Sequence, residues 1–173
     1  MKGTIIKCLE ELVVNKFGKD KWEMSAKNAG LDSGKAIFSI SDVDDSQTMK
    51  IVESVCNTLG ISLEQAADAF GDYWVNVYSQ KMYSHYYDRD SAKSFLLNMD
   101  NVHVAMTKQM KNARPPRFEY EWKDDKTLVM HYKSHRGLID FVVGLARGVG
   151  NYYKEDLHVT KLGNKEIQIV FKK

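Results

Sequence analysis

The sequence predicts an α+β domain, with helices first and then a small antiparallel sheet that has helices packed against it. Three observations predict it. Apolar residues recur at helical spacing through the first two thirds of the chain, whereas after Pro116 they alternate with charged residues, and a final pair of alternating segments flanks Gly163-Asn164. A chain of 173 residues suits one domain, residues 1–173, large enough to enclose a cofactor.

The bulk composition is that of an ordinary soluble protein. It is 43% apolar and 28% charged, and its net charge of +2 favours neither nucleic acid nor a membrane as the main partner. No run of about 18 apolar residues is present, and the N-terminus lacks the sections of a signal peptide. We therefore expect a cytoplasmic protein.

Two helices are expected to open the chain. The first covers residues 5–17, and Gly18 can end it in a left-handed conformation. A second helix should run from about residue 20 to residue 28. Residues 32–34 then predict a loop, and residues 37–40 an extended segment.

Capping residues delimit the third and fourth helices. Asp44 or Asp45 can cap the third, which Gly60 should end. Ser62 with Gln65 forms a capping box that begins the fourth. The broad packing side of the fourth helix carries Ala66, Phe70, Tyr73, Trp74 and Val77.

A further helix over residues 95–110, with Asp90 as its N-cap, carries a histidine on its apolar side. His103 lies beside a stripe made by Phe95, Met99, Val102, Met106 and Met110. A buried imidazole needs a partner, because leaving it without one costs about 1–3 kcal/mol. The partner can be a hydrogen-bonding group of the core or a metal ion, and the helix alone leaves both open.

Strand periodicity begins after Pro115 and Pro116, which must end helical structure. Asp124-Asp125 makes the turn of a predicted hairpin, and a second hairpin turns at Gly163-Asn164. A helix over about residues 137–152 separates the two hairpins. The alternating residues of the first hairpin are Phe118, Tyr120, Trp122, Leu128, Met130 and Tyr132.

Three polar side chains follow at spacing two, from Tyr132 through Ser134 to Arg136. An extended backbone would point all three to one side. A phenol, a hydroxyl and a guanidinium that converge can bind a carboxylate or a phosphate. A solvent-exposed strand face would show the same sequence pattern.

These residues together resemble the heme nitric oxide/oxygen binding (H-NOX) family, which includes the heme domain of soluble guanylate cyclase. The resemblance rests on His103 in Asp-Asn-Val-His, on Pro115-Pro116, on Tyr132-x-Ser134-x-Arg136 and on the opening Met1-Lys-Gly-Thr-Ile-Ile. The resemblance covers essentially the whole chain. Within the family, the chain resembles the stand-alone bacterial type.

The resemblance implies a heme b cofactor, enclosed between a helical subdomain of about residues 1–60 and a larger α/β subdomain of about residues 61–173. It implies that His103 is the proximal iron ligand and that Pro116 contacts and distorts the ring. Tyr132, Ser134 and Arg136 would hold the propionates.

The distal side is expected to be apolar. Oxygen-binding relatives carry a tyrosine where this chain has Phe141, and Leu9 and Trp74 match the other polar distal positions. Only Trp74 has a donor there. With Ile5 and Leu145 these residues predict a pocket that binds NO and CO at ferrous heme without stable oxygen binding.

The resemblance also implies a mechanism of sensing. NO weakens the bond between iron and His103, and the domain shifts its conformation to signal. No catalytic domain lies within these residues, so we expect a sensor and not an enzyme. A separate histidine kinase or cyclic-di-GMP cyclase or phosphodiesterase would receive the signal.

Three alternatives stay open. The domain could be an oxygen-binding heme sensor in which Trp74 or a loop tyrosine donates to the ligand. It could be a module without cofactor that binds a partner's carboxylate or phosphate. It could also be a hydrolytic metal enzyme that uses His103, His131 and His135, although no ligand spacing supports that.

Overall fold

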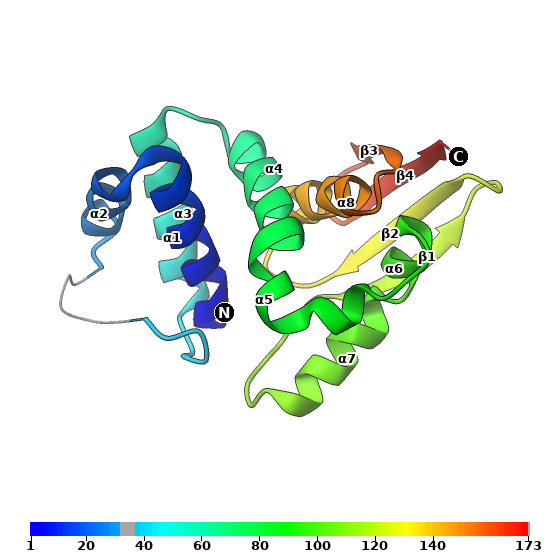
Figure 1. Cartoon of the computed structure of the whole chain (residues 1–173), viewed down its shortest axis with the longest axis horizontal. Coiled ribbons are helices and arrows are strands. Elements are labelled where there is room, and N and C mark those ends of the chain that lie inside the picture. Colours follow the sequence, from blue (N-terminus) through cyan, green and yellow to red (C-terminus); the bar gives the residue numbers. More distant parts are fainter. Residues whose placement is uncertain (32–36, 173) are drawn as a thin grey trace. The chain divides into compact units, whose positions relative to one another are not determined.

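The computed structural model describes residues 1–31 and 37–172, which form two compact units, Met1–Ala66 and Ala67–Lys173 (Figure 1). The first unit is helical. The second combines helices with a four-stranded antiparallel sheet. The predicted α+β class is therefore confirmed.

Three helices and the start of a fourth build the first unit. They are α1 (Gly3–Phe17), α2 (Lys19–Asn28), α3 (Asp45–Leu59) and α4 (Leu63–Tyr73). Gly18 does end α1, but at φ 98° and ψ 158°, which is outside the left-handed helical region that we predicted. The buried apolar residues of this unit include Ile6, Leu12, Val13, Ile51 and Val55.

The predicted capping groups of α3 and α4 are all in place. The side chain of Asp44 accepts a hydrogen bond of 2.8 Å from the backbone N–H of Ser46, and Gly60 ends α3 at φ 66° and ψ 34°. Ser62 Oγ accepts from Gln65 N at 3.1 Å, while Gln65 Oε1 accepts from Ser62 N at 2.9 Å. This reciprocal pair is the capping box.

Replacing Gly60 by Ala should lower the free energy of unfolding by about 1 kcal/mol, because a side chain disfavours the left-handed conformation at that position. Denaturant unfolding followed by circular dichroism measures the change. Gly163→Ala is the control, since Gly163 has no positive φ and an added methyl group would meet nothing within 4 Å. Equal effects of the two substitutions would contradict the expectation.

The expected extended segment at residues 37–40 is wrong. Residues 39–40 form a turn, and the carbonyl of Ser39 accepts a hydrogen bond of 2.9 Å from the N–H of Thr4, as the carbonyl of the adjoining Ser41 does from Gly3 at 2.8 Å. The segment therefore supplies acceptors to the N-terminus of α1 and does not pair as a strand. The loop predicted at residues 32–34 lies outside the described residues.

The sheet of the second unit contains both predicted hairpins. Its strands are β1 (Arg117–Trp122), β2 (Thr127–Lys133), β3 (Asp156–Lys161) and β4 (Glu166–Lys172), in the order β1-β2-β4-β3. The cross-strand partners in the first hairpin join the alternating residues of the two segments, which are Phe118 with Tyr132, Tyr120 with Met130 and Trp122 with Leu128.

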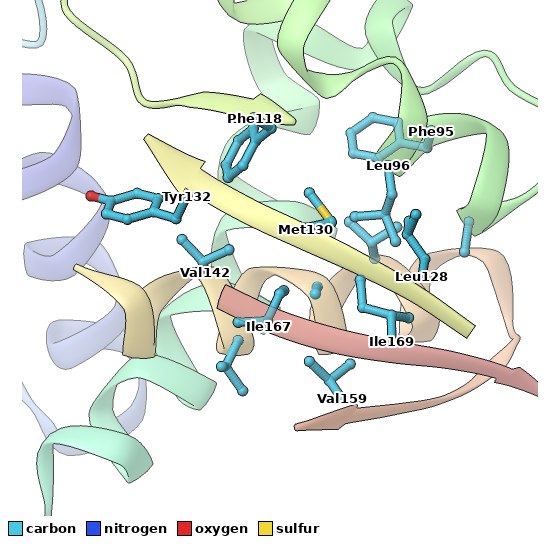
Figure 2. Packing of buried hydrophobic residues seen from close by; sticks show 14 of the residues in the cluster. Phe95, Leu96, Phe118, Leu128, Met130, Tyr132, Val142, Val159, Ile167 and Ile169 are labelled. Atoms are coloured by element: carbon cyan, nitrogen blue, oxygen red, sulfur yellow. The ribbon is translucent and has the colours of Figure 1, made fainter. Parts of the chain in front are cut away.

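Helices α6 (Ala92–Leu97) and α8 (Ile139–Tyr153) pack against the sheet and against each other. Helix α8 starts two residues later than the predicted residue 137. In Figure 2 the apolar side chains of β2 and β4 meet those of both helices in one cluster. Its labelled members are Phe95, Leu96, Phe118, Leu128, Met130, Tyr132, Val142, Val159, Ile167 and Ile169.

The N-cap of α6 is Ser91, so the predicted cap Asp90 is wrong. Ser91 has extended backbone angles, φ −160° and ψ 161°, and its Oγ accepts a hydrogen bond of 3.1 Å from Ser94 N. Those are the conformation and the contact that an N-cap requires.

A π-helical segment η1 (Trp74–Tyr78) continues α4, followed by α5 (Gln80–Tyr83) and a 3₁₀ segment η2 (Ser84–Tyr87). The wider π turn shifts the facing of the residues within it. Val77, predicted on the packing side, is consequently 41% exposed. The amide of Asn76 donates to the carbonyl of Gly148 at 3.2 Å, which ties the segment to α8.

Helices α4 and α8 cross with their backbones in contact. A Cβ atom built on Gly71 would lie 2.1 Å from the carbonyl carbon of Gly144, and one on Gly144 would lie 2.1 Å from the carbonyl oxygen of Ala67. Neither position can hold a side chain unless the helices separate. Glycine is required here for closeness of approach.

Candidate functional site

His103 lies on α7 (Met99–Gln109), which the structure separates from α6 at Asn98. The single helix predicted over residues 95–110 is therefore wrong. The N–H of Asn98 bonds to the carbonyls of Ser94 and Phe95, at 3.3 and 3.1 Å, in a tightened last turn. Apolar spacing continues through this junction, so the sequence pattern does not reveal it.

The imidazole of His103 has one nitrogen engaged by the backbone. Its Nδ1 lies 2.7 Å from the carbonyl oxygen of Pro116. A carbonyl can only accept, so Nδ1 carries the proton and Nε2 holds the lone pair that a metal ion would use. Burial lowers the pKa of His103, which favours this neutral form. The ring centroid lies 5.6 Å from that of Phe118.

The extended backbone predicted for Tyr132, Ser134 and Arg136 does not continue as far as Arg136. Strand β2 ends at Lys133, and Arg136 lies in a bend beyond it. The backbone N–H of Arg136 donates to Ser134 Oγ at 3.3 Å, and its Nη1 donates to the carbonyl oxygen of Arg114. The three residues therefore belong to a strand end and a turn, in which Ser134 and Arg136 are in direct contact.

The hydroxyl group of Tyr132 is turned out of the apolar cluster. The residue is only 2% exposed, yet among the described residues its hydroxyl has no hydrogen-bond partner. Figure 2 shows the oxygen directed away from the labelled apolar side chains. A group placed in this way can donate to a carboxylate.

The five predicted distal residues divide between the two units. Ile5 and Leu9 lie on α1, and Leu9 is buried. Trp74 starts η1, while Phe141 and Leu145 lie on one side of α8 and are half-buried.

Aromatic rings surround Phe141 and Trp74 within the second unit. Phe141 meets Phe70 edge to face at 5.4 Å between centroids. Phe70 stacks on Trp74 at 5.9 Å, and Trp74 stacks on Tyr78 at 5.6 Å. No described residue accepts a hydrogen bond from the indole N–H of Trp74.

Two side chains that the sequence analysis did not single out for the site hold α7. Arg117 binds the carboxylate of Asp100 through Nε at 2.7 Å and Nη2 at 2.5 Å. The hydroxyl of Tyr120 donates to the carbonyl of Leu96 at 2.9 Å. The only sequence signal for them was their place on the strand that follows Pro116.

Two other kinds of site find no support among the described residues. No three His, Cys, Asp or Glu side chains come close enough together to hold a metal ion. His131 instead lies between the carboxylates of Glu166, at 3.0 Å, and Glu121, at 3.3 Å. None of the described helices has the length and apolarity needed to cross a bilayer.

Comparison with known proteins now decides the family. The model of the haem-NO-binding family matches residues 2–161. The chain belongs to the H-NOX family. Soluble guanylate cyclases gcy-32 and gcy-35 of Caenorhabditis elegans are each 29% identical to it, over 86% of this chain. The chain spans about a fifth, 22%, of the length of these relatives.

Solved H-NOX structures share the fold. A Cs H-NOX mutant is 25% identical, with a TM-score of 0.86, and covers 100% of this chain and 97% of its own. An oxygen-binding H-NOX domain related to soluble guanylate cyclases is also 25% identical, with a TM-score of 0.83 over 100% and 96%. This H-NOX chain is therefore a heme-binding gas-sensor domain related to soluble guanylate cyclases.

Proposed function

We propose that this H-NOX domain is an NO-selective sensor, which binds NO and CO at ferrous heme and does not bind oxygen stably. The observation that carries the proposal is Phe141, half-buried on α8 with its ring against Phe70 and without a hydroxyl group. Dioxygen bound to ferrous iron takes on negative charge, so a hydrogen-bond donor beside it would stabilise the complex by about 1.5–3 kcal/mol. NO on ferrous iron needs that donor much less.

The residues present fit heme b. The tautomer of His103 fixed by Pro116 leaves Nε2 to bind iron, and we assign His103 as the proximal ligand. Tyr132, Ser134 and Arg136 supply hydrogen-bond donors and a cation for the propionates. From its resemblance to the family we assign Pro116 to ring contact and distortion, and its carbonyl group also orients the imidazole of His103.

Heme held by His103 would supply an iron centre that can take up a diatomic gas. On NO binding, His103 would hold the cofactor less tightly, and its imidazole, carried by α7, would be free to move. A ligand shifts a conformational equilibrium only through its different affinity for the two states, and loss of the His103 bond provides that difference. The receiver would be a separate cytoplasmic histidine kinase or cyclic-di-GMP enzyme.

An absorption spectrum of the reduced protein, before and after exposure to air, tests the selectivity. We expect the ferrous spectrum to persist, apart from slow oxidation, and to change at once on addition of NO or CO. An immediate and reversible change in air would contradict NO selectivity. It would leave heme binding by the domain intact.

Oxygen sensing is the second candidate, and one observation favours it. The indole N–H of Trp74 has no acceptor among the described residues, so it is a donor not engaged by its own unit. Under this alternative Trp74→Phe would abolish a reversible change in air. Under the NO-selective proposal the substitution leaves the behaviour in air as it was.

A further inference from the structure

We propose that Arg117 and Tyr120 of β1 are positioning residues, which fix α7 and thereby the imidazole of His103. The inference rests on the proposed role of His103 as heme ligand and extends it. Neither residue needs to touch the heme. Both act through the helix that carries His103.

Few fully buried side chains hold α7. Of its eleven residues only Val102 is buried, whereas a helix of the core such as α8 buries eight of fifteen. Burial of one valine contributes roughly 1.5–3 kcal/mol and does not fix the rotation of a helix about its axis. Directional polar contacts must therefore set the orientation of α7.

Arg117 provides the first of these contacts. Its Nε and Nη2 bind the two carboxylate oxygens of Asp100, at 2.7 and 2.5 Å, and the backbone N–H of Phe118 donates to the same carboxylate at 2.9 Å. The Arg117 guanidinium lowers the pKa of Asp100, so the carboxylate stays charged. A bidentate arginine–carboxylate pair fixes the relative orientation of the two side chains as well as their distance.

Tyr120 provides the second contact, at the junction of α6 and α7. Its hydroxyl donates to Leu96 O at 2.9 Å and accepts from Asp100 N at 3.3 Å, so it bridges the last turn of α6 and the first turn of α7. Burial raises the pKa of Tyr120 to about 12, which keeps the hydroxyl protonated and able to donate. The bridge spans the break at Asn98.

These contacts bear on His103 through the helix period. Asp100 and His103 are three residues apart and thus lie on the same face of α7. That face is turned to β1, because His103 Nδ1 bonds to Pro116 O while Asp100 binds Arg117. Without Arg117 and Tyr120, two bonds to the backbone of the strand segment would remain on this face: His103 Nδ1 to Pro116 O, and Asp100 to the N–H of Phe118.

The test uses Arg117→Gln, Tyr120→Phe and the double variant, with matched controls elsewhere in the second unit. Arg147→Gln removes another arginine bound to an aspartate, Asp68, at 2.7 Å. Tyr153→Phe removes another hydroxyl bound to a backbone carbonyl, that of Tyr87, at 2.7 Å. Because Arg117 is 54% exposed, Arg117→Gln should not prevent folding.

Two readouts are needed. In the heme-free protein, hydrogen exchange of residues 99–109 should become about tenfold faster or more in the double variant and stay unchanged in the controls. In the heme-loaded ferrous protein, the iron–histidine stretching band in resonance Raman spectra should shift or broaden. Transfer of heme to an acceptor protein should be about tenfold faster.

An unchanged stretching band together with unchanged exchange in the double variant would overturn the inference. A change in thermal stability alone, without either, would overturn it as well, because that is what a merely structural role predicts. If heme proved to be held by another residue, the proposed function would fail. The exchange measurement would still decide whether Arg117 and Tyr120 hold α7.

Discussion

Replacing His103 by Gly is expected to abolish stable heme retention, and added imidazole should restore it. The substitution removes Nε2 of the proposed iron ligand, whose other ring nitrogen is bound to Pro116 O, and it opens a space that a free imidazole can fill. Loss of a direct ligand should exceed the 10–100-fold that outer-shell groups contribute to metal affinity. Absorbance of the purified protein, relative to its protein content, measures the retained heme.

His135→Gly is the matched control, because His135 is exposed and lies in a bend beyond β2. It should retain heme at the level of the unaltered protein. Rescue by imidazole separates loss of the ligand from misfolding. Unchanged heme content in the His103 variant would identify a different ligand and would remove the basis of the proposed function.

Replacing Phe141 by Tyr is expected to give the domain measurable oxygen affinity, about 10- to 100-fold above that of the unaltered protein. The added hydroxyl supplies the charge-assisted hydrogen bond, worth about 1.5–3 kcal/mol, that the phenylalanine cannot make. The ring itself keeps its contact with Phe70. Titration of the ferrous protein with oxygen, followed by absorption, gives the dissociation constants.

Phe141→Leu is the control, because it changes the ring without adding a donor. It should leave oxygen affinity low while NO still binds. If the leucine and tyrosine variants gained the same oxygen affinity, the low oxygen affinity of the unaltered protein would be due to lack of space and not to lack of a hydrogen-bond donor. In that case the selectivity argument from Phe141 would be wrong.

Local signals explain what the sequence could predict of the fold. Capping residues and turns act over three or four positions, so the limits of α3, the capping box at Ser62 and both hairpins were predictable. The alternation of Phe118 and Tyr132 with charged residues also set the register of β1 against β2. Each of these features depends on neighbours in the chain.

What the sequence missed depends on partners far along the chain. The break at Asn98 is bridged by Tyr120, about twenty residues later, and apolar spacing runs through it unchanged. The π turn is tied by Asn76 to a carbonyl of α8, 72 residues away. The same holds for Tyr132, Ser134 and Arg136. The resemblance indicates these residues, but the turn that contains Arg136 depends on a hydrogen bond to the carbonyl of Arg114, 22 residues earlier in the chain.

The glycine crossing of α4 and α8 has a consequence for ligand discrimination. Where two main chains touch, no layer of side chains exists that could repack to absorb a displacement. The gap between Phe70, carried by α4, and Phe141, carried by α8, is therefore set by the main chain and hardly by rotamers. Under the proposed function, a hydroxyl group added at Phe141 would therefore change the hydrogen bonding offered to a gas while the spacing of Phe70 and Phe141 stays as it is.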